Sequence, residues 1–591
     1  MAVEEPGRVA ESAAPPPSAR LALWILVALA VLAPWPFGAT QPWAVRAITL
    51  IVLATAIIVS LEQARHGALW LPRAPLWPAA ILVALGFIQL VPLPAGLHAI
   101  LARGSAEVWH PNEPAAAALM TARARPLSIY PAATSAWLGM TGGLIALALL
   151  AVPALGRRRT MITAAWILIG AGTLVAVYGI VARAVFGPLL YGHIAVPTVS
   201  PLGPFVNKNH FAGYVLMPGL LALGLGRGLW RQAAADPHTP RASPRALVAF
   251  AAAAVMLLAV LSSLSRGGAL GILFGMAVFA TVELLTARHP GSIGRVLVPA
   301  SLGVLLMIVA MLLPSDAKER LSLTRWQGDR STSFRIEIWQ DSLRAWTASP
   351  IAGQGLGAFA DVLPRFKTTA GAFRVEHPEN EILETAVEGG LVALSAVAMI
   401  VAGGVVLSVR AIRGHRDRVL RGIVSGAVAG VAGLTAHGLV DFNLRVPSNA
   451  TMFMALAVLA VAPRGYDPWH GRGRWGLLAA LVVVGLTYAR SAEAAPILRE
   501  ARAFAVKAHS EDRAATLRAS MADRRVRDYL GRRPADPEGW LLAAWCALTQ
   551  GDAETAAGLA RHAVTLDPDH AAVREAVKAL TGSAASAERV K

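Results

Sequence analysis

The chain contains a series of apolar runs, each long enough to form a helix that crosses a membrane. Such a helix needs about 20 predominantly apolar residues. We expect about thirteen spans, at 20–35, 44–61, 76–94, 134–153, 161–186, 211–226, 246–264, 267–285, 294–313, 383–409, 420–440, 448–463 and 475–490. Only 15% of the 591 residues are charged, against roughly 25% in a soluble domain. The sequence therefore predicts an all-α polytopic membrane protein with about 12–13 transmembrane helices.

The charge is strongly basic. The formal net charge is +18, from 54 Lys and Arg against 36 Asp and Glu. Such a balance can indicate a nucleic-acid partner, but 55% of the residues are hydrophobic, and basic residues of membrane proteins usually lie in the loops that orient the helices. We therefore expect no nucleic-acid partner. The single cysteine, Cys546, excludes a disulfide framework and a cysteine-based metal site.

Arginine alternates between successive loops, and this pattern predicts the orientation of the chain. One set of loops, with the N-terminal tail, holds 21 basic residues, and the opposite short loops hold about eight. The richer side should be cytoplasmic, with the N-terminus inside and the C-terminus outside. The first span lacks a small-residue cleavage site, so we interpret it as an anchor rather than a removed signal peptide.

The chain should therefore divide into three parts. These are a cytoplasmic tail (1–19), a transmembrane domain (20–490) with a large outer loop (314–382), and an outer C-terminal helical domain (491–591). A loop as long as the outer one is usually functional.

The C-terminal domain carries small residues at the spacing of a tetratricopeptide repeat. The pattern consists of Trp540, Ala544, Ala547, Ala556, Ala560, Ala563 and Pro568. Gly551-Asp552 supplies the turn between two helices, and residues 497–533 fit a degenerate unit. The alternative is a generic helical hairpin. Because fewer than three repeats rarely stand alone, we expect this tail to pack on the membrane domain or to dock a protein partner.

Two polar constellations mark the outer ends of apolar spans. Asn207, Lys208, Asn209 and His210 precede one span, where donors at a helix start favour an anion; the alternative is a capped interfacial turn. Arg266, in Ser-Arg-Gly-Gly, has no acidic neighbour in sequence. An arginine at membrane depth is a functional candidate, and its alternative role is to snorkel to the lipid headgroups.

Two further constellations belong to the long outer loop. Arg335 begins an amphipathic helix with an apolar stripe through Ile336 and Trp339 that would suit a membrane surface. A solvated or headgroup-bound arginine is the alternative. His377 precedes Asn380 and Glu381 at the start of a span. There the helix N-terminus should lower the histidine pKa and keep the ring neutral; the alternative is a capping histidine.

One more outer turn contains Asp441 and Arg445, which could pair. Arginine suits phosphate through its planar fork, and a neutral histidine suits deprotonation of a hydroxyl. Together these residues indicate transfer of a group from a phosphate-bearing lipid to an alcohol on the outer surface.

Over about residues 200–450 the sequence resembles the bacterial O-antigen ligase and polymerase family. The resemblance rests on the order and spacing of five segments, FVNKNHFA (205–212), SRGG (265–268), Arg335 with Trp339, HPENE (377–381) and DFNL (441–444).

This resemblance implies an inner-membrane glycosyltransferase whose donor is a glycan on undecaprenyl diphosphate. Arg266 and Arg335 would hold the diphosphate, and His377 would activate the acceptor hydroxyl. The reaction would invert the anomeric carbon without a metal or other cofactor. The family usually has Asn directly after the histidine, whereas here Pro378 and Glu379 intervene, so the roles of Asn380 and Glu381 stay open.

Three functions remain from the sequence. A ligase would transfer the glycan to lipid A-core. A polymerase of O-antigen or exopolysaccharide would extend a growing chain, and a related enzyme would glycosylate protein. A polysaccharide transporter would carry ionisable residues at mid-membrane, for which Glu283 and Arg183 are the candidates.

Overall fold

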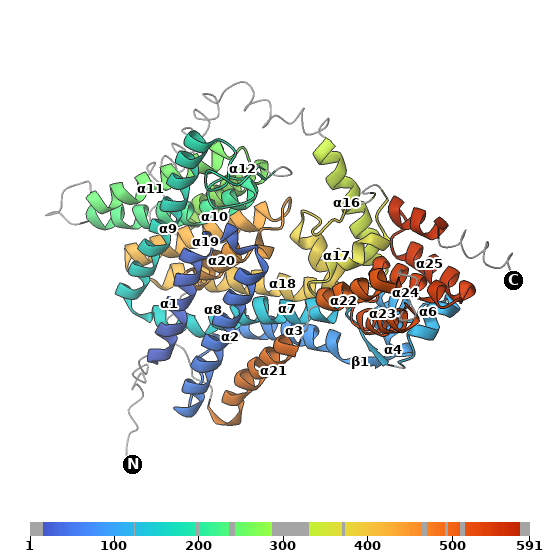
Figure 1. Ribbon diagram of the computed structural model, residues 1–591. Coiled ribbons are helices and arrows are strands. Elements are labelled where there is room, and N and C mark those ends of the chain that lie inside the picture. The colour runs from blue at the N-terminus through green and yellow to red at the C-terminus, as the bar shows by residue number, and fades with distance from the viewer. Residues whose placement is uncertain are drawn as a thin grey trace, which may run out of the picture.

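The computed structural model shows a membrane protein built almost entirely of helices, with one two-stranded sheet among the described residues (Figure 1). It describes residues 16–122, 124–196, 200–235, 243–285, 330–368, 371, 373–461, 470–490, 494–508 and 515–579. The expected span at 294–313 and the start of the long outer loop, 314–329, lie outside these residues. Each of the other twelve expected spans coincides with a helix.

Among the described residues, eight helices are long and apolar enough to cross a membrane. Seven of them are α2 (Pro42–Arg65), α9 (Arg158–Phe186), α10 (Lys208–Ala233), α11 (Pro244–Ser262), α12 (Arg266–Leu285), α18 (Glu381–Gly414) and α19 (Arg418–His437). The eighth is the continuous run Pro131–Gly156, which consists of α7 (Pro131–Trp137), η2 (Leu138–Gly142), α8 (Gly143–Ala151) and η3 (Val152–Gly156). The shorter apolar helices are α1 (Pro17–Leu32), α3 (Arg73–Leu90), α20 (Pro447–Ala460) and α21 (Gly476–Arg490). The chain is thus a multi-pass membrane protein.

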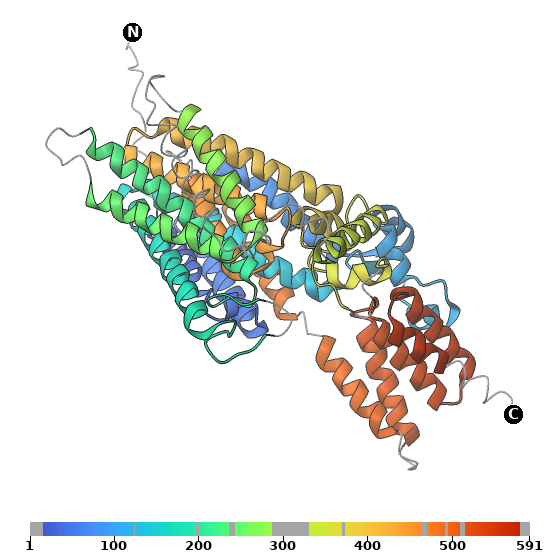
Figure 2. The same ribbon diagram turned by 90° about the horizontal axis from the view of Figure 1, so that it is seen from above.

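The remaining elements lie mostly at one end of this bundle. They are η1 (Phe37–Ala39), β1 (Pro92–Pro94), α4 (Ala95–Leu101), α5 (Arg103–Trp109), α6 (Pro114–Leu119), β2 (Ala124–Pro126), α16 (Arg330–Thr347), α17 (Phe359–Val362), η4 (Leu363–Arg365), η5 (Asn443–Arg445), η6 (Gly471–Trp475), α22 (Ala494–Ala508), α23 (Ala515–Leu530), α24 (Pro537–Thr549) and α25 (Ala553–Leu566). The strands β1 and β2 pair antiparallel, with Leu93 opposite Arg125. Figure 2 shows α16 and the C-terminal helices beyond the end of the bundle.

A seam of glycines lets three central helices approach closely. On α19, Gly422 and Gly426 face Gly224 of α10, and Gly433 faces Gly271 of α12. Side chains there would strike backbone atoms of the neighbouring helix. Small residues at such crossings are the usual device of membrane helices, because they allow close van der Waals contact between backbones. The seam aligns the starts of α10 and α12 with the end of α19.

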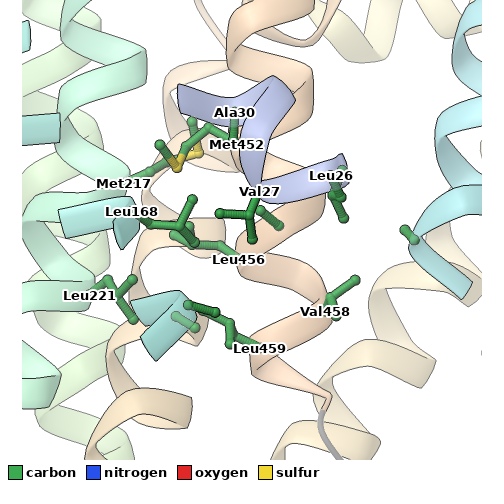
Figure 3. Packing of buried hydrophobic residues seen from close by; sticks show 14 of the residues in the cluster. Leu26, Val27, Ala30, Leu168, Met217, Leu221, Met452, Leu456, Val458 and Leu459 are labelled. Carbon is green, nitrogen blue, oxygen red and sulfur yellow. The ribbon is translucent and has the colours of Figure 1, made fainter. Parts of the chain in front are cut away.

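Around this seam the bundle is filled by interlocking apolar side chains. Figure 3 shows Val27 of α1, Leu168 of α9, Met217 of α10 and Leu456 of α20 meeting in one layer. All four are at most 3% exposed, so the four helices share one core.

The arginine-rich loops meet at the opposite end from the C-terminal helices. Arg158 Nε lies 2.5 Å from Asp417 Oδ2, and Arg231 lies 2.6 Å from Glu283 Oε2. Glu283, a candidate mid-membrane charge, therefore sits near the end of α12 with an arginine partner. Charged residues from several loops that we expected on the same side of the membrane thus lie at the same end of the bundle.

The C-terminal helices share a core with the outer loops. Buried residues of this core include Trp109 of α5, Phe359 of α17, Tyr529 of α23 and Trp540 of α24. The helices α24 and α25 pack on each other as the sequence predicted, with Gly551 at φ +83° in the turn between them. The expectation that the tail packs on the membrane protein is met within this one chain, while its assignment to the tetratricopeptide class stays a prediction.

The glycine seam predicts that Gly224→Ala destabilises the protein, because the added Cβ would strike the Gly422 carbonyl oxygen. Overpacking of this kind costs about 1–3 kcal/mol. Gly403→Ala on α18 is the matched control, since its Cβ would meet nothing within 4 Å. The melting temperature of the detergent-solubilised protein should fall for the first variant and hold or rise for the second. Equal melting temperatures would contradict the seam.

Candidate active site

The predicted polar segments meet at the end of the bundle where α10, α12 and α18 begin and α19 ends. The backbone N–H of Glu381 donates to the carbonyl of Gly438 at 2.9 Å, which joins the start of α18 to the end of α19. Asn449 Nδ2 donates to the carbonyl of His210 at 3.0 Å, which joins α20 to α10. The glycine after Arg266, Gly267, lies directly against the His437 ring.

His377 is held by a carboxylate and an aromatic ring. Its Nδ1 lies 2.9 Å from Glu384 Oε1, and its ring stacks on Phe442 with centroids 4.3 Å apart. The side chain is 27% exposed. With Nδ1 bound to the carboxylate, Nε2 is the nitrogen placed to meet a substrate hydroxyl.

The expected lowering of the His377 pKa is wrong. Burial does act to lower it, but the charge of Glu384 and the hydrogen bond to it outweigh burial, so the pKa is raised above its ordinary 6.5. The sequence argument considered the helix N-terminus but not a carboxylate one turn inside the helix. A histidine oriented by a carboxylate is the usual arrangement of a general base.

Arg445 is surrounded by three glutamates of α18. Its guanidinium lies 3.1 Å from Glu384, 2.7 Å from Glu388 and 3.8 Å from Glu381. Burial disfavours the charge of Arg445, but the three carboxylates raise its pKa further above the usual value. Arg445 therefore pairs with these glutamates rather than with Asp441, and it neutralises the carboxylates that surround His377.

Asp441 lies between two buried imidazoles. Its carboxylate oxygens are 3.5 Å from His210 Nε2 and 3.6 Å from His437 Nε2. Burial acts to raise the pKa of Asp441, but these two imidazoles hold it below the ordinary value. His210 also packs edge-on against Phe442, at 4.8 Å between centroids, so this group contacts the same ring as His377.

Arg335, on α16, approaches the site from the outer side. Its NH2 lies 2.6 Å from Glu379 Oε2, and one turn later Trp339 donates to the Pro378 carbonyl at 2.8 Å. Glu379 has a φ of +55°, unusual for a residue other than glycine. The buried face of α16 runs through Ile338 and Ala345, whereas the predicted apolar stripe leaves Ile336 48% exposed. The insertion that departs from the family pattern thus supplies the carboxylate partner of Arg335.

The other predicted residues lie at the helix starts. Arg266 is the first residue of α12 and is half-buried. Lys208 Nζ donates to the Leu264 carbonyl at 3.4 Å, which joins α10 to the turn before α12. Asn207 caps α10 by accepting from the Asn209 N–H at 2.9 Å.

Asn380 and Glu381 organise the start of α18. Asn380 caps the helix by accepting from the N–H groups of Ile382 and Leu383, each at 3.0 Å, and Glu381 accepts from the Leu444 N–H at 2.6 Å. These contacts position the helix start, as do those of Asn207 and Lys208.

The sequence analysis missed several members of this site. Glu384 and Glu388 were not singled out, although glutamates at 381, 384 and 388 lie on one helix face and ionisable residues within an apolar span indicate function. His437 carried the same signal inside the expected span 420–440, and Phe442 belongs to the segment 441–444 that resembles the family. Their contacts could not be foreseen, because these depend on which turn meets which helix. In the described part of the chain, no group of three or more His, Cys, Asp or Glu side chains has the arrangement of a metal site.

The Arg445 cluster predicts a large loss of stability for Arg445→Ala. Removing the cation leaves three carboxylates together at a buried position, which costs about 3–5 kcal/mol for a broken buried pair. Adding Glu388→Gln to this variant removes one of the uncompensated charges and should restore part of the loss. A melting curve for each variant tests this, and no recovery in the double variant would show that the glutamates are not the reason.

Comparison with known proteins gives one family match. A family model described as O-antigen ligase (Wzy_C) matches residues 251–398. No curated protein matches the chain. The matched stretch contains Arg266, Arg335 and His377 with the carboxylate Glu384, and it excludes the Lys208 segment and Asp441. Over residues 251–398 the chain is therefore similar to the O-antigen ligase family.

Proposed function

We propose that the protein is a metal-independent, inverting glycosyltransferase of the inner membrane. It transfers a glycan from undecaprenyl diphosphate to an acceptor hydroxyl, with lipid A-core as the first candidate acceptor. The observation that carries this proposal is the contact of His377 with Glu384, at the end of the bundle where Arg335 and Arg266 also lie. The arginine-rich end would face the cytoplasm, and the site and C-terminal helices the periplasm.

In this mechanism His377 Nε2 takes the proton from the acceptor hydroxyl. The hydroxyl oxygen bonds to the anomeric carbon, and the bond from that carbon to the diphosphate oxygen breaks. The electron pair leaves with the diphosphate, and attack from the opposite face inverts the carbon. Glu384 holds the ring and stabilises the imidazolium, while the arginines balance the charge that develops on the leaving diphosphate.

Glu379 forms an ion pair with Arg335. Their 2.6 Å contact places a carboxylate where a phosphate oxygen would bind, so the diphosphate must displace it. Burial is the main reason that the pKa of Glu379 is raised, with Asp441 adding to the effect. A carboxylate with a weakened preference for its charged form is easier to displace from Arg335.

A transporter is disfavoured by the position of Glu283. Its contacts with Arg227 at 3.6 Å and Arg231 at 2.6 Å account for this charge as an ion pair at a helix end. Glu283 therefore does not support a transporter, which would need a charge along a path at mid-membrane.

Transfer should be lost in His377→Ala and Arg266→Ala, and strongly reduced in Arg335→Gln. Glu379→Gln is the matched contrast, because it releases Arg335 and should retain transfer with a lower KM for the donor. The assay uses purified folded protein and the lipid-linked glycan of its host. Near-normal transfer by His377→Ala would refute the mechanism.

The products of a deletion strain separate the acceptor classes. Without a ligase, long lipid-linked chains accumulate, whereas without a polymerase, single lipid-linked repeat units accumulate. Loss of glycan from protein with both lipid-linked pools unchanged would instead identify a protein glycosyltransferase.

The raised pKa of His377 predicts the pH dependence of transfer. The base must be unprotonated, so kcat/KM should rise with pH through an inflection above 6.5, the ordinary value. In Glu384→Gln the charge that raises the pKa is gone and burial dominates, so the inflection should move to lower pH while the rate falls. An inflection at the same pH in both proteins would exclude this pair as the titrating base.

A further inference from the structure

A cavity of about 330 Å3 lies between the outer loop that leads to His377 and the C-terminal helices. Phe373 and Arg374 line it from the loop, and Glu538, Leu541 and His570 line it from the C-terminal helices. Its volume is at the lower end of the range of about 300–1,000 Å3 for small-molecule sites. The site described above does not use it.

The walls combine an aromatic ring with charges of both signs. Phe373 is 62% exposed. Arg374 lies 3.5 Å from Asp361, and Lys367 lies 3.1 Å from Asp567 at the buried side of the cavity. Mixed donors and acceptors beside an exposed ring suit a ligand that has hydroxyl groups on its edge and an apolar face of C–H groups.

One buried polar atom at the cavity also lacks a partner. His570 Nδ1 makes no hydrogen bond within the described part of the chain. Buried polar atoms are nearly always hydrogen-bonded, so an unsatisfied nitrogen in a cavity wall indicates a place for a ligand hydroxyl or for water.

The chain connectivity places this cavity close to the base. Arg374 precedes His377 by three residues, and an extended chain advances at most about 3.6 Å per residue. The two Cα atoms are therefore at most about 11 Å apart, a distance that a short saccharide can bridge. The acidic residues in the wall disfavour the diphosphate itself as the occupant.

We infer that this cavity is a saccharide subsite, which binds sugar units of the glycan or acceptor away from the bond being formed. The inference rests on the proposed function. The C-terminal helices form half of the subsite, so they take part in substrate recognition within the same chain. Phe373 stacks on a sugar face, and Arg374, Glu538 and His570 bind its hydroxyl groups.

The test measures binding of free glycan to the purified full-length protein. The probe is the oligosaccharide released by mild acid from the host's lipid-linked glycans, and the readout is saturation-transfer NMR with titration. Phe373→Ala should bind about fivefold to tenfold more weakly, the effect of losing one stacked ring. Phe373→Tyr keeps a ring and should bind nearly as the wild type does.

Two glutamates provide a matched pair for the hydroxyl contacts. Glu538 and Glu554 each lie in the first turn of a C-terminal helix, but only Glu538 lines the cavity. Glu538→Gln should weaken glycan binding, and Glu554→Gln should leave it unchanged. Equal effects of the two changes would overturn the assignment.

His377→Ala separates this inference from the proposed function. It should lose transfer yet bind free glycan as the wild type does. If His377→Ala retained transfer, the proposed mechanism would be refuted, but the assignment of the saccharide subsite would not be affected. Absence of glycan binding by the wild type, binding unaffected by Phe373→Ala, or displacement of the glycan by an unrelated peptide pool would each overturn the subsite.

Discussion

The close approach of α10, α12 and α19 is the constraint on which the site depends. In a bilayer, apolar side chains gain little by leaving lipid for protein, so helices associate through close packing and hydrogen bonds. The glycines of α19 allow its backbone to touch those of α10 and α12. Because these helices cannot slide without collisions, their ends are fixed together. Contacts within the bundle thus bring the start of α12 with Arg266, the start of α10 with His210 and the end of α19 with His437 to one place.

The site itself is organised by charge neutralisation. Three glutamates of α18 would be costly together at a buried position, and Arg445 from the α19–α20 turn balances them. One of these glutamates, Glu384, also holds His377. The arginine therefore holds Glu384, and through it His377, at the start of α18. A second pair, Arg335 and Glu379, repeats this principle at the outer edge of the site.

The C-terminal helices are joined to the outer loops through a shared apolar core and several ion pairs. Arg533 lies 2.6 Å from Asp361, and Arg561 lies 3.0 Å from Glu113. Such contacts place these helices against earlier parts of the same chain, and Figure 1 shows α25 close to α6. These contacts therefore fit a role of the C-terminal helices in recognition of substrate sugars, beside the docking of a protein partner that the repeat pattern suggested.

The sequence by itself determined the helices, because apolar runs of membrane length leave no other structure for the backbone. It also singled out His377, Arg266 and Arg335 as candidates, because their segments resemble those of the family, and their roles stay predictions. Only the tertiary structure decided which charges meet. Asp441 lies four residues from both His437 and Arg445, yet it contacts His437 and the distant His210, whereas Arg445 contacts glutamates of α18. Sequence spacing cannot choose between these two neighbours, because the choice depends on how the glycine seam aligns the helix ends.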